Sequence, residues 1–184
     1  MSVVPAVPRA QAPLLAVPHY RDAGTSPIVT SLAHVPEALD VTLPFVAVVL
    51  GPSAIDARTK ELVIVRTSAL LECRYCVQTH TAAALDRGVT VAEVRALRGT
   101  GPWESTFDDD ADRSLLAWVD AVAGGRGTVA PALADTLRAH WSDADVVELT
   151  LLCSATMMLN RYCSALALPT STDTLNRLDA EGLR

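Results

Sequence analysis

Apolar residues recur every three or four positions along most of the chain, and no long segment alternates between apolar and polar residues as a half-buried strand would. A stripe through Leu62 and Val65 follows Asp56, a residue type that caps the start of helices. A second helix is predicted through Cys76 and is expected to stop at Gly88. These patterns predict an all-α fold, built as a compact helical bundle.

Capping signals predict further helices downstream. Thr90, with Glu93 three residues later, forms a capping box, and the acidic segment 108–112 suits the positive end of a helix dipole. Pro131 is well placed as a first helical residue, and Ser142 opens a long apolar helix. Aromatic residues make up only 4% of the chain, which also favours helices over strands.

Prolines divide the N-terminal part of the chain. Residues 1–18 contain four prolines, which cannot continue a helix and favour extended geometry. We predict an N-terminal arm over this segment and a single all-α domain over residues 19–184. The apolar residues of the arm suit packing on a neighbouring subunit, and an unpacked tail is the alternative. Pro36 and Pro44 are expected to interrupt the helical segment between residues 31 and 50.

An Arg-Tyr-Cys triplet occurs twice, at residues 74–76 and 161–163, in a chain with only three tyrosines and four cysteines. The same offset of 87 residues relates an Asp-Ala pair and a Glu-Leu pair upstream of each triplet. We therefore predict two duplicated helical units that pack about a pseudo-twofold axis. The copies differ where chemistry is expected, because Asn160 stands in the place of Cys73.

Length, charge and cysteine content exclude several classes of protein. A chain of 184 residues can bury the core of one domain. Its 15 basic and 21 acidic residues give a formal net charge of -6, so we expect neither nucleic acid nor an anionic membrane as a partner. The longest apolar stretch, residues 146–159, is too short to cross a bilayer. Few cysteines and the absence of a signal-peptide pattern predict a soluble protein of the reducing cytoplasm.

The most informative segment is Cys73-Arg74-Tyr75-Cys76, followed by His80. Steps of three and four residues place Cys73, Cys76 and His80 on one face of a helix, where they can share a site. Near a helix N-terminus, free N–H groups and the helix dipole lower the pKa of a thiol and raise its thiolate fraction. A partner cysteine three residues away can then trap an oxidised sulfur as a disulfide before irreversible oxidation.

A proton relay is predicted beside the thiols. His80 titrates near neutral pH and can accept a proton from Cys76 directly or through water, while Glu61 can orient His80 or complete the relay. In one straight helix Glu61 and Cys73 would lie about 18 Å apart. We therefore predict that the chain reverses between Leu70 and Cys73, although no Gly or Pro marks the reversal.

Other interpretations of this segment remain open. The two cysteines of the motif can be small buried hydrophobic residues, with His80 a core histidine. Zinc would need a fourth ligand that the sequence does not supply. Covalent haem would need a histidine where Val77 stands, and a thioredoxin-like motif would need a βαβ unit. We favour thiol redox chemistry, expect no metal and no cofactor, and predict that Cys153 and Cys163 are core residues.

Glu61, the motif from Cys73 to Cys76, and His80 resemble the alkyl hydroperoxidase D-like branch of the carboxymuconolactone decarboxylase family. The resemblance is best over residues 43–99 and weaker towards the C-terminus. It implies an all-helical, carboxymuconolactone decarboxylase-like domain that assembles as a homo-oligomer, a trimer or a hexamer.

The resemblance also implies a role for each residue of the motif. Cys76 matches the peroxidatic cysteine, which attacks the O–O bond, and Cys73 matches the partner that protonates the leaving group and closes the disulfide. Glu61 and His80 match the proton relay. The family's best-known peroxidases are re-reduced by a dithiol such as a lipoyl-bearing protein. Tyr75 is a departure, because some of these peroxidases have a histidine between the cysteines.

Our hypothesis is a cofactor-free thiol peroxidase or dithiol-disulfide oxidoreductase that reduces a small hydroperoxide, an alkylhydroperoxidase-like enzyme with peroxiredoxin-type activity. Two alternatives remain. Lactone decarboxylation or a related proton transfer would use a carboxylate, an imidazole and an arginine without sulfur. A helical oligomer that senses redox state would form a reversible disulfide without catalytic turnover.

Overall fold

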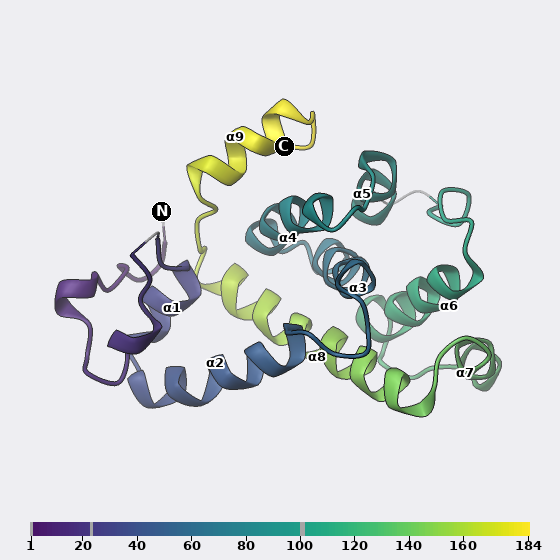
Figure 1. Ribbon diagram of the computed structural model, residues 1–184, viewed down its shortest axis with the longest axis horizontal. Helices are drawn as coiled ribbons and strands as arrows, with labels where there is room; N and C mark the ends of the chain where they lie inside the picture. The colour runs from purple at the N-terminus through teal and green to yellow at the C-terminus, as the bar shows by residue number, and fades with distance from the viewer. Residues whose placement is uncertain (1, 23, 100–101) are drawn as a thin grey trace.

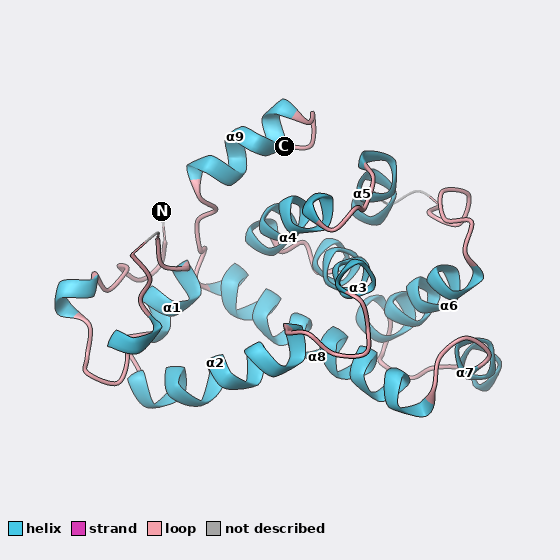
Figure 2. Ribbon diagram, viewed as in Figure 1, coloured by secondary structure: helices cyan, strands magenta, loops and turns pink. Residues whose placement is uncertain are grey.

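Helices account for all the regular secondary structure in the computed structural model, which describes residues 2–22, 24–99 and 102–184 (Figure 2). The all-α prediction is confirmed. The α-helices are α1 (Pro27–Leu32), α2 (Pro36–Leu50), α3 (Ala57–Leu70), α4 (Arg74–Asp86), α5 (Val91–Arg98), α6 (Asp110–Val119), α7 (Pro131–Arg138), α8 (Asp143–Ala165) and α9 (Thr172–Ala180). A π-helical turn, Asp120–Gly124, extends α6, and two 3-10 turns lie at Arg9–Gln11 and Val17–His19.

The predicted caps start the predicted helices. Asp56 Oδ1 accepts a hydrogen bond from the Thr59 backbone N–H at 2.9 Å and so caps α3. Capping boxes begin α5 at Thr90 and α8 at Ser142. The C-terminal helix α9 was absent from the sequence prediction, and its signal is Ser171, whose hydroxyl accepts from the Thr174 N–H.

Of the two expected interruptions of the first helical segment, the one at Pro36 is confirmed, because α1 ends at Leu32, and the one at Pro44 needs correction. Pro36 is the first residue of α2 and starts that helix, as a residue without an N–H donor can. Pro44 lies inside α2, which continues through it to Leu50. Proline leaves the carbonyl four residues earlier, on Asp40, without its helical partner. Asp40 and Pro44 are both exposed, so water can satisfy that carbonyl and the helix can continue.

Helix α3 lies at the centre of the molecule and packs on α4, α5, α6 and α8 (Figure 1). Ten of its fourteen residues are buried, including polar ones, so it has no solvent-facing side along most of its length. Its apolar side chains join two core clusters. One centres on Val63 and Ile64 with α6, α7 and α8, and the other centres on Leu62 and Val65 with α4, α5 and α9.

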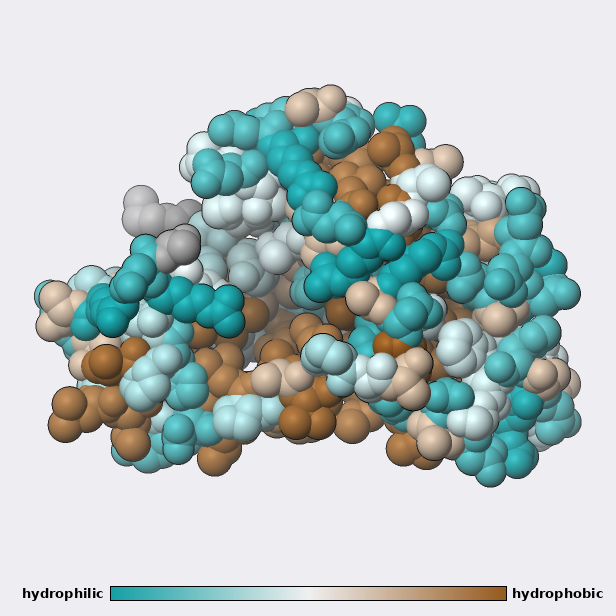
Figure 3. Space-filling model, viewed as in Figure 1, coloured by the Kyte–Doolittle hydropathy of each residue, from teal (hydrophilic) through white to brown (hydrophobic). Residues whose placement is uncertain are grey.

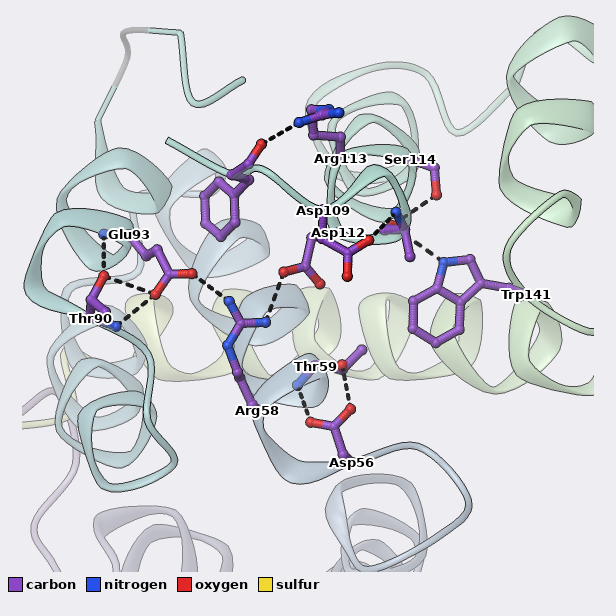
Figure 4. Close-up of polar contacts among 12 residues, drawn as sticks. Asp56, Arg58, Thr59, Thr90, Glu93, Asp109, Asp112, Arg113, Ser114 and Trp141 are labelled. Atoms are coloured by element: carbon purple, nitrogen blue, oxygen red, sulfur yellow. Dashed lines mark hydrogen bonds and ion pairs between the residues drawn. The ribbon is translucent and has the colours of Figure 1, made fainter. Parts of the chain in front are cut away.

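An ion-pair network holds the start of α3 against two neighbours. The Arg58 guanidinium lies between Glu93 of α5 and Asp112 of α6, and its Nη1 donates to Asp112 Oδ2 at 2.8 Å (Figure 4). Glu93 also accepts from Thr90 in the capping box of α5. One arginine thereby connects three helices, which fixes α3, the helix that carries Glu61.

The N-terminal arm packs on its own chain. The Val3 N–H donates to the Leu166 carbonyl at 2.9 Å, and the Val7 N–H donates to the Thr30 carbonyl at 3.0 Å. Tyr20 adds a hydrogen bond from its hydroxyl to the Val7 carbonyl. The arm is therefore attached to α1 and to the end of α8. Among the described residues, no helix combines the length and apolar character that crossing a membrane requires.

The two copies of the internal repeat differ in backbone. Residues 71–73 join α3 to α4, whereas their counterparts at the same offset, residues 158–160, lie inside α8. The second copy is thus one continuous helix where the first is two helices joined by a turn. The Arg-Tyr-Cys triplet consequently starts a helix in the first copy and ends one in the second.

Candidate active site

A tight turn between α3 and α4 places the cysteine motif at the start of a helix. Glu72 adopts a left-handed conformation with φ of 54°. The Cys73 N–H donates to the Ser68 carbonyl at 3.0 Å and the Glu72 N–H donates to the Ala69 carbonyl at 3.0 Å, which is the Schellman pattern of helix termination. The predicted reversal between Leu70 and Cys73 is confirmed. Glycine usually takes the left-handed position, and its absence hid the turn from local sequence signals.

The two motif cysteines meet at the N-terminus of α4. Cys73 is the N-cap residue and Cys76 lies in the first turn, and their sulfur atoms are 2.7 Å apart. Both are free thiols and both are buried. A disulfide requires about 2.05 Å between sulfur atoms, so a small side-chain movement would allow the bond to form.

Hydrogen bonding among the thiols lowers the pKa of Cys73 and raises the pKa of Cys76. Hydrogen bonding with the thiols of Cys163 and Cys76 lowers the pKa of Cys73 to about 3, against the opposing effect of burial. The pKa of Cys76 is raised, because its proton is held between the Cys163 and Cys73 sulfur atoms and because it is buried. The resting pair is therefore a Cys73 thiolate beside a Cys76 thiol, with the thiolate at the residue that caps the helix.

Glu61 and His80 lie together, as the relay prediction requires. Glu61 Oε2 is 2.9 Å from His80 Nδ1, and Glu61 is almost fully buried. A carboxylate only accepts, so His80 Nδ1 carries a proton, and in the neutral form of the ring Nε2 is the acceptor. Arg87, at the end of α4, binds the other carboxylate oxygen, with 3.1 Å from its Nη1 to Oε1. Arg87 is two helical turns beyond His80 on the same face, a spacing that sequence reasoning could have used.

A cavity of about 220 Å³ connects the relay to the thiols. Cys76 and His80 both line it, whereas Cys73 does not. Asn160 of α8 also lines this cavity; its Nδ2 donates to Ser68 Oγ, but its buried Oδ1 has no hydrogen-bond partner among the described residues. Within those residues no hydrogen bond joins His80 to Cys76 directly, so a proton between them must pass through a molecule in the cavity.

A third thiol lies at this site, and the sequence analysis did not predict its position there. Cys163, predicted as a core residue, is buried in one cluster with Cys73 and Cys76. Cys153, the other predicted core cysteine, packs in the main core and lies 3.4 Å from Thr67 Oγ1. The repeat aligned Cys163 with Cys76 but gave no sign that the two residues meet. Among the described residues, no group of three or more His, Cys, Asp or Glu side chains forms a metal-binding cluster.

The lowered pKa of Cys73 predicts a thiolate that persists in mild acid. Because its pKa is about 3 instead of 9.0, Cys73 is ionised at neutral pH and accepts a proton only as the pH falls towards about 3. The ultraviolet absorbance of the thiolate should therefore change little between about pH 8 and about pH 5. It should disappear in Cys73→Ser and remain in Cys153→Ser. A thiolate that forms only above about pH 8 in the wild type would contradict this electrostatic description.

The match to known families lies on the same segment. Residues 36–121 match the model of the carboxymuconolactone decarboxylase family. They contain Glu61, Cys73, Cys76 and His80, so the match lies on the residues that carry the resemblance predicted from the sequence. A comparison with curated proteins gives no match.

Three solved structures share the fold. An uncharacterized peroxidase-related protein from Ralstonia eutropha JMP134 with an alkylhydroperoxidase AhpD core is 18% identical, with a TM-score of 0.82 over 94% of each chain. A protein of unknown function from Agrobacterium tumefaciens, provisionally named an antioxidant defence protein AhpD, is 25% identical, with a TM-score of 0.70 over 77% of this chain and 96% of that one. A cysteine-to-alanine variant of the debrominase Bmp8 bound to 2,3,4-tribromopyrrole is 18% identical, with a TM-score of 0.78 over 98% of this chain and 100% of that one.

These likenesses bear on function only at the level of the family. The family match and the AhpD-like structures support a peroxidase-related or decarboxylase-like role. Bmp8 carries a different activity on the same fold. A shared helical scaffold therefore leaves the reaction to be argued from the site itself.

Proposed function

We propose that the protein is a cofactor-free thiol peroxidase, or a closely related dithiol-disulfide oxidoreductase, that reduces a small hydroperoxide. One observation carries the proposal. Two free thiols lie 2.7 Å apart, and the one that lines a cavity shares that cavity with a histidine bound to a buried carboxylate. This arrangement supports the assignment of Cys76 as nucleophile, Cys73 as resolving thiol and His80 with Glu61 as proton relay.

In the first step Cys76 attacks the hydroperoxide. Its proton moves to the adjacent Cys73 thiolate, and the resulting Cys76 thiolate attacks the terminal oxygen of the peroxide. The O–O bond breaks, Cys76 becomes a sulfenic acid, and the alkoxide leaving group takes the proton from Cys73 and becomes an alcohol, which leaves Cys73 as a thiolate again. Asn160 Oδ1 supplies an acceptor for the O–H group of the incoming peroxide.

In the second step the thiolate of Cys73 attacks the Cys76 sulfenic acid. A disulfide forms, and the hydroxyl leaves as water with a proton from the relay of His80 and Glu61. The sum is the oxidation of one thiolate and one thiol to a disulfide and the reduction of one hydroperoxide to an alcohol and water, with one proton taken up from solvent through the relay. His80, Glu61 and Arg87 also line a neighbouring cavity of about 370 Å³, through which the relay can exchange protons with solvent.

Partners and location follow from this cycle. A dithiol or lipoyl-type reductant protein must return the disulfide to two thiols, and a reducing cytoplasm suits a site that works as free thiols. Exposed apolar side chains support a homo-oligomer, a trimer or hexamer. Val41 and Val48 of α2 expose 68% and 77% of their surface, and Figure 3 shows apolar side chains gathered along the edge that α2 forms.

Steady-state peroxide consumption tests the proposal. With excess dithiothreitol, the wild type should consume many equivalents of cumene hydroperoxide per chain. A reversible disulfide with no turnover under any dithiol would instead identify a redox sensor. A proton-transfer activity on a lactone that survives the double change Cys73→Ser and Cys76→Ser, but is lost in His80→Ala, would favour the decarboxylase alternative.

A further inference from the structure

The thiol cluster has two entrances. Cys163 lines a cavity of about 510 Å³, formed by the start of α4, the end of α8 and the segment that leads to α9. Cys73 and Cys76 do not line this cavity, and Cys163 does not line the smaller cavity of Cys76 and His80. Tyr75 lines both cavities and forms a wall between them. In Figure 3 the molecule is hollowed between the N-terminal segment and α4, where the larger cavity lies.

The two cavities suit different reactants. The smaller one is lined by His80 and the unpartnered Asn160 oxygen, which suit a small molecule with an O–O bond. The larger one is bordered by Glu72, Arg74 and Gln78 and has more than twice the volume, so it can admit a longer group. Cys163 is the one cysteine of the buried cluster that faces this larger space.

We propose that Cys163 is a third redox-active thiol, which receives the disulfide from the Cys73–Cys76 pair and presents it to an external dithiol in the larger cavity. This inference rests on the proposed thiol peroxidase function. It separates the entrance of the oxidant, at Cys76, from the entrance of the reductant, at Cys163.

The exchange needs no further oxidant or reductant. The Cys163 sulfur attacks the Cys76 sulfur of the disulfide, the bond between Cys73 and Cys76 breaks, and the Cys163 proton goes to the released Cys73 or to solvent. Cys73 is a good leaving group, because a thiol of low pKa leaves fast. A thiolate of the external dithiol then attacks Cys163, and its second thiol completes the reaction. The dithiol loses two electrons and becomes an intramolecular disulfide, and Cys76 and Cys163 return to thiols.

Rates of re-reduction test this inference. Wild type, Cys163→Ser and Cys153→Ser are oxidised with one equivalent of cumene hydroperoxide, and the return of free thiols is then followed after addition of dithiothreitol. Cys163→Ser should be re-reduced at least about tenfold more slowly than the wild type. This decrease should exceed any change in the rate at which the variant is oxidised. Cys153 is buried on the same helix but lies outside the cluster. Cys153→Ser should therefore be re-reduced at the wild-type rate. Thermal unfolding and a second variant, Cys163→Ala, exclude a folding defect as the cause.

Disulfide mapping gives the second readout. Acid-quenched wild type should contain a fraction of chains with a Cys76–Cys163 disulfide during re-reduction. Re-reduction of Cys163→Ser and Cys163→Ala at the wild-type rate, or no disulfide to Cys163 at any time, would overturn the inference. If hydroperoxide removes no thiols from the wild type, the proposed function fails instead. The pair is then oxidised with diamide, and the same comparison of rates still decides the role of Cys163.

Discussion

Replacing Cys76 with serine is expected to abolish hydroperoxide reduction, a loss of about 10³-fold or more in kcat/KM. Cys76 is the thiol of the pair that lines the cavity with His80, so it is the sulfur that a substrate meets first. A serine hydroxyl is a very weak nucleophile at neutral pH and cannot form a sulfenic acid. Peroxide consumption in the presence of dithiothreitol measures the effect.

Removal of the resolving thiols separates the attack on the hydroperoxide from the formation of the disulfide. In the double variant Cys73→Ser/Cys163→Ser the first attack can still occur, but neither neighbouring thiol of the cluster remains to close a disulfide with the sulfenic acid. This variant should consume about one hydroperoxide per chain and accumulate a sulfenic acid that dimedone traps. Cys153→Ser is the matched control and should keep its activity within about twofold. Wild-type activity in Cys76→Ser would refute the assignment of the nucleophile.

Removal of the imidazole in His80→Ala should lower kcat by about 10²-fold to 10⁴-fold and change KM much less. His80 is held by Glu61 and lines the cavity of Cys76, so it can move protons there without binding most of the substrate. Single-turnover measurements should show that sulfenic acid formation and disulfide closure both slow. Exposed His140, at the end of α7, provides the control, and His140→Ala should leave both steps unchanged.

Glu61→Gln tests whether the carboxylate acts through His80. The amide keeps the size of the side chain but loses the charge that favours a protonated imidazole and the ion pair with Arg87. The expected loss in kcat is smaller, about tenfold, and it should nearly vanish in a His80→Ala background, because coupled residues are not additive. Additive losses in the double variant would show that Glu61 does not act through His80.

Local sequence signals were sufficient to predict the helices that surround the site. The caps at Asp56, Thr90 and Ser142 begin helices where the sequence places them, because a cap is decided by a few neighbouring residues. The shared face of Cys73 and Cys76 followed from helical spacing alone. The reversal between α3 and α4 had no Gly or Pro to mark it, and only the need to bring Glu61 near His80 predicted it.

Contacts between distant segments could not be predicted in the same way. Cys163 and Asn160 reach the site because α8 runs beside α3 and α4, and no local pattern encodes that packing. The proline at position 44 predicted a break, but α2 continues through it because the carbonyl that loses its helical partner is on the exposed side of the helix. Residues that act across helices therefore need the tertiary structure, whereas residues within one helix can be found from spacing.

Oxidation with one equivalent of hydroperoxide tests the central claim most directly. The reduced protein has four free cysteines, and after the reaction two free thiols should remain, with one disulfide per chain that joins Cys76 to Cys73 or, after exchange, to Cys163. The intact mass should fall by two hydrogen atoms and gain no oxygen. A protein that keeps all four thiols, or that gains oxygen without forming a disulfide to Cys76, would contradict the proposed thiol chemistry.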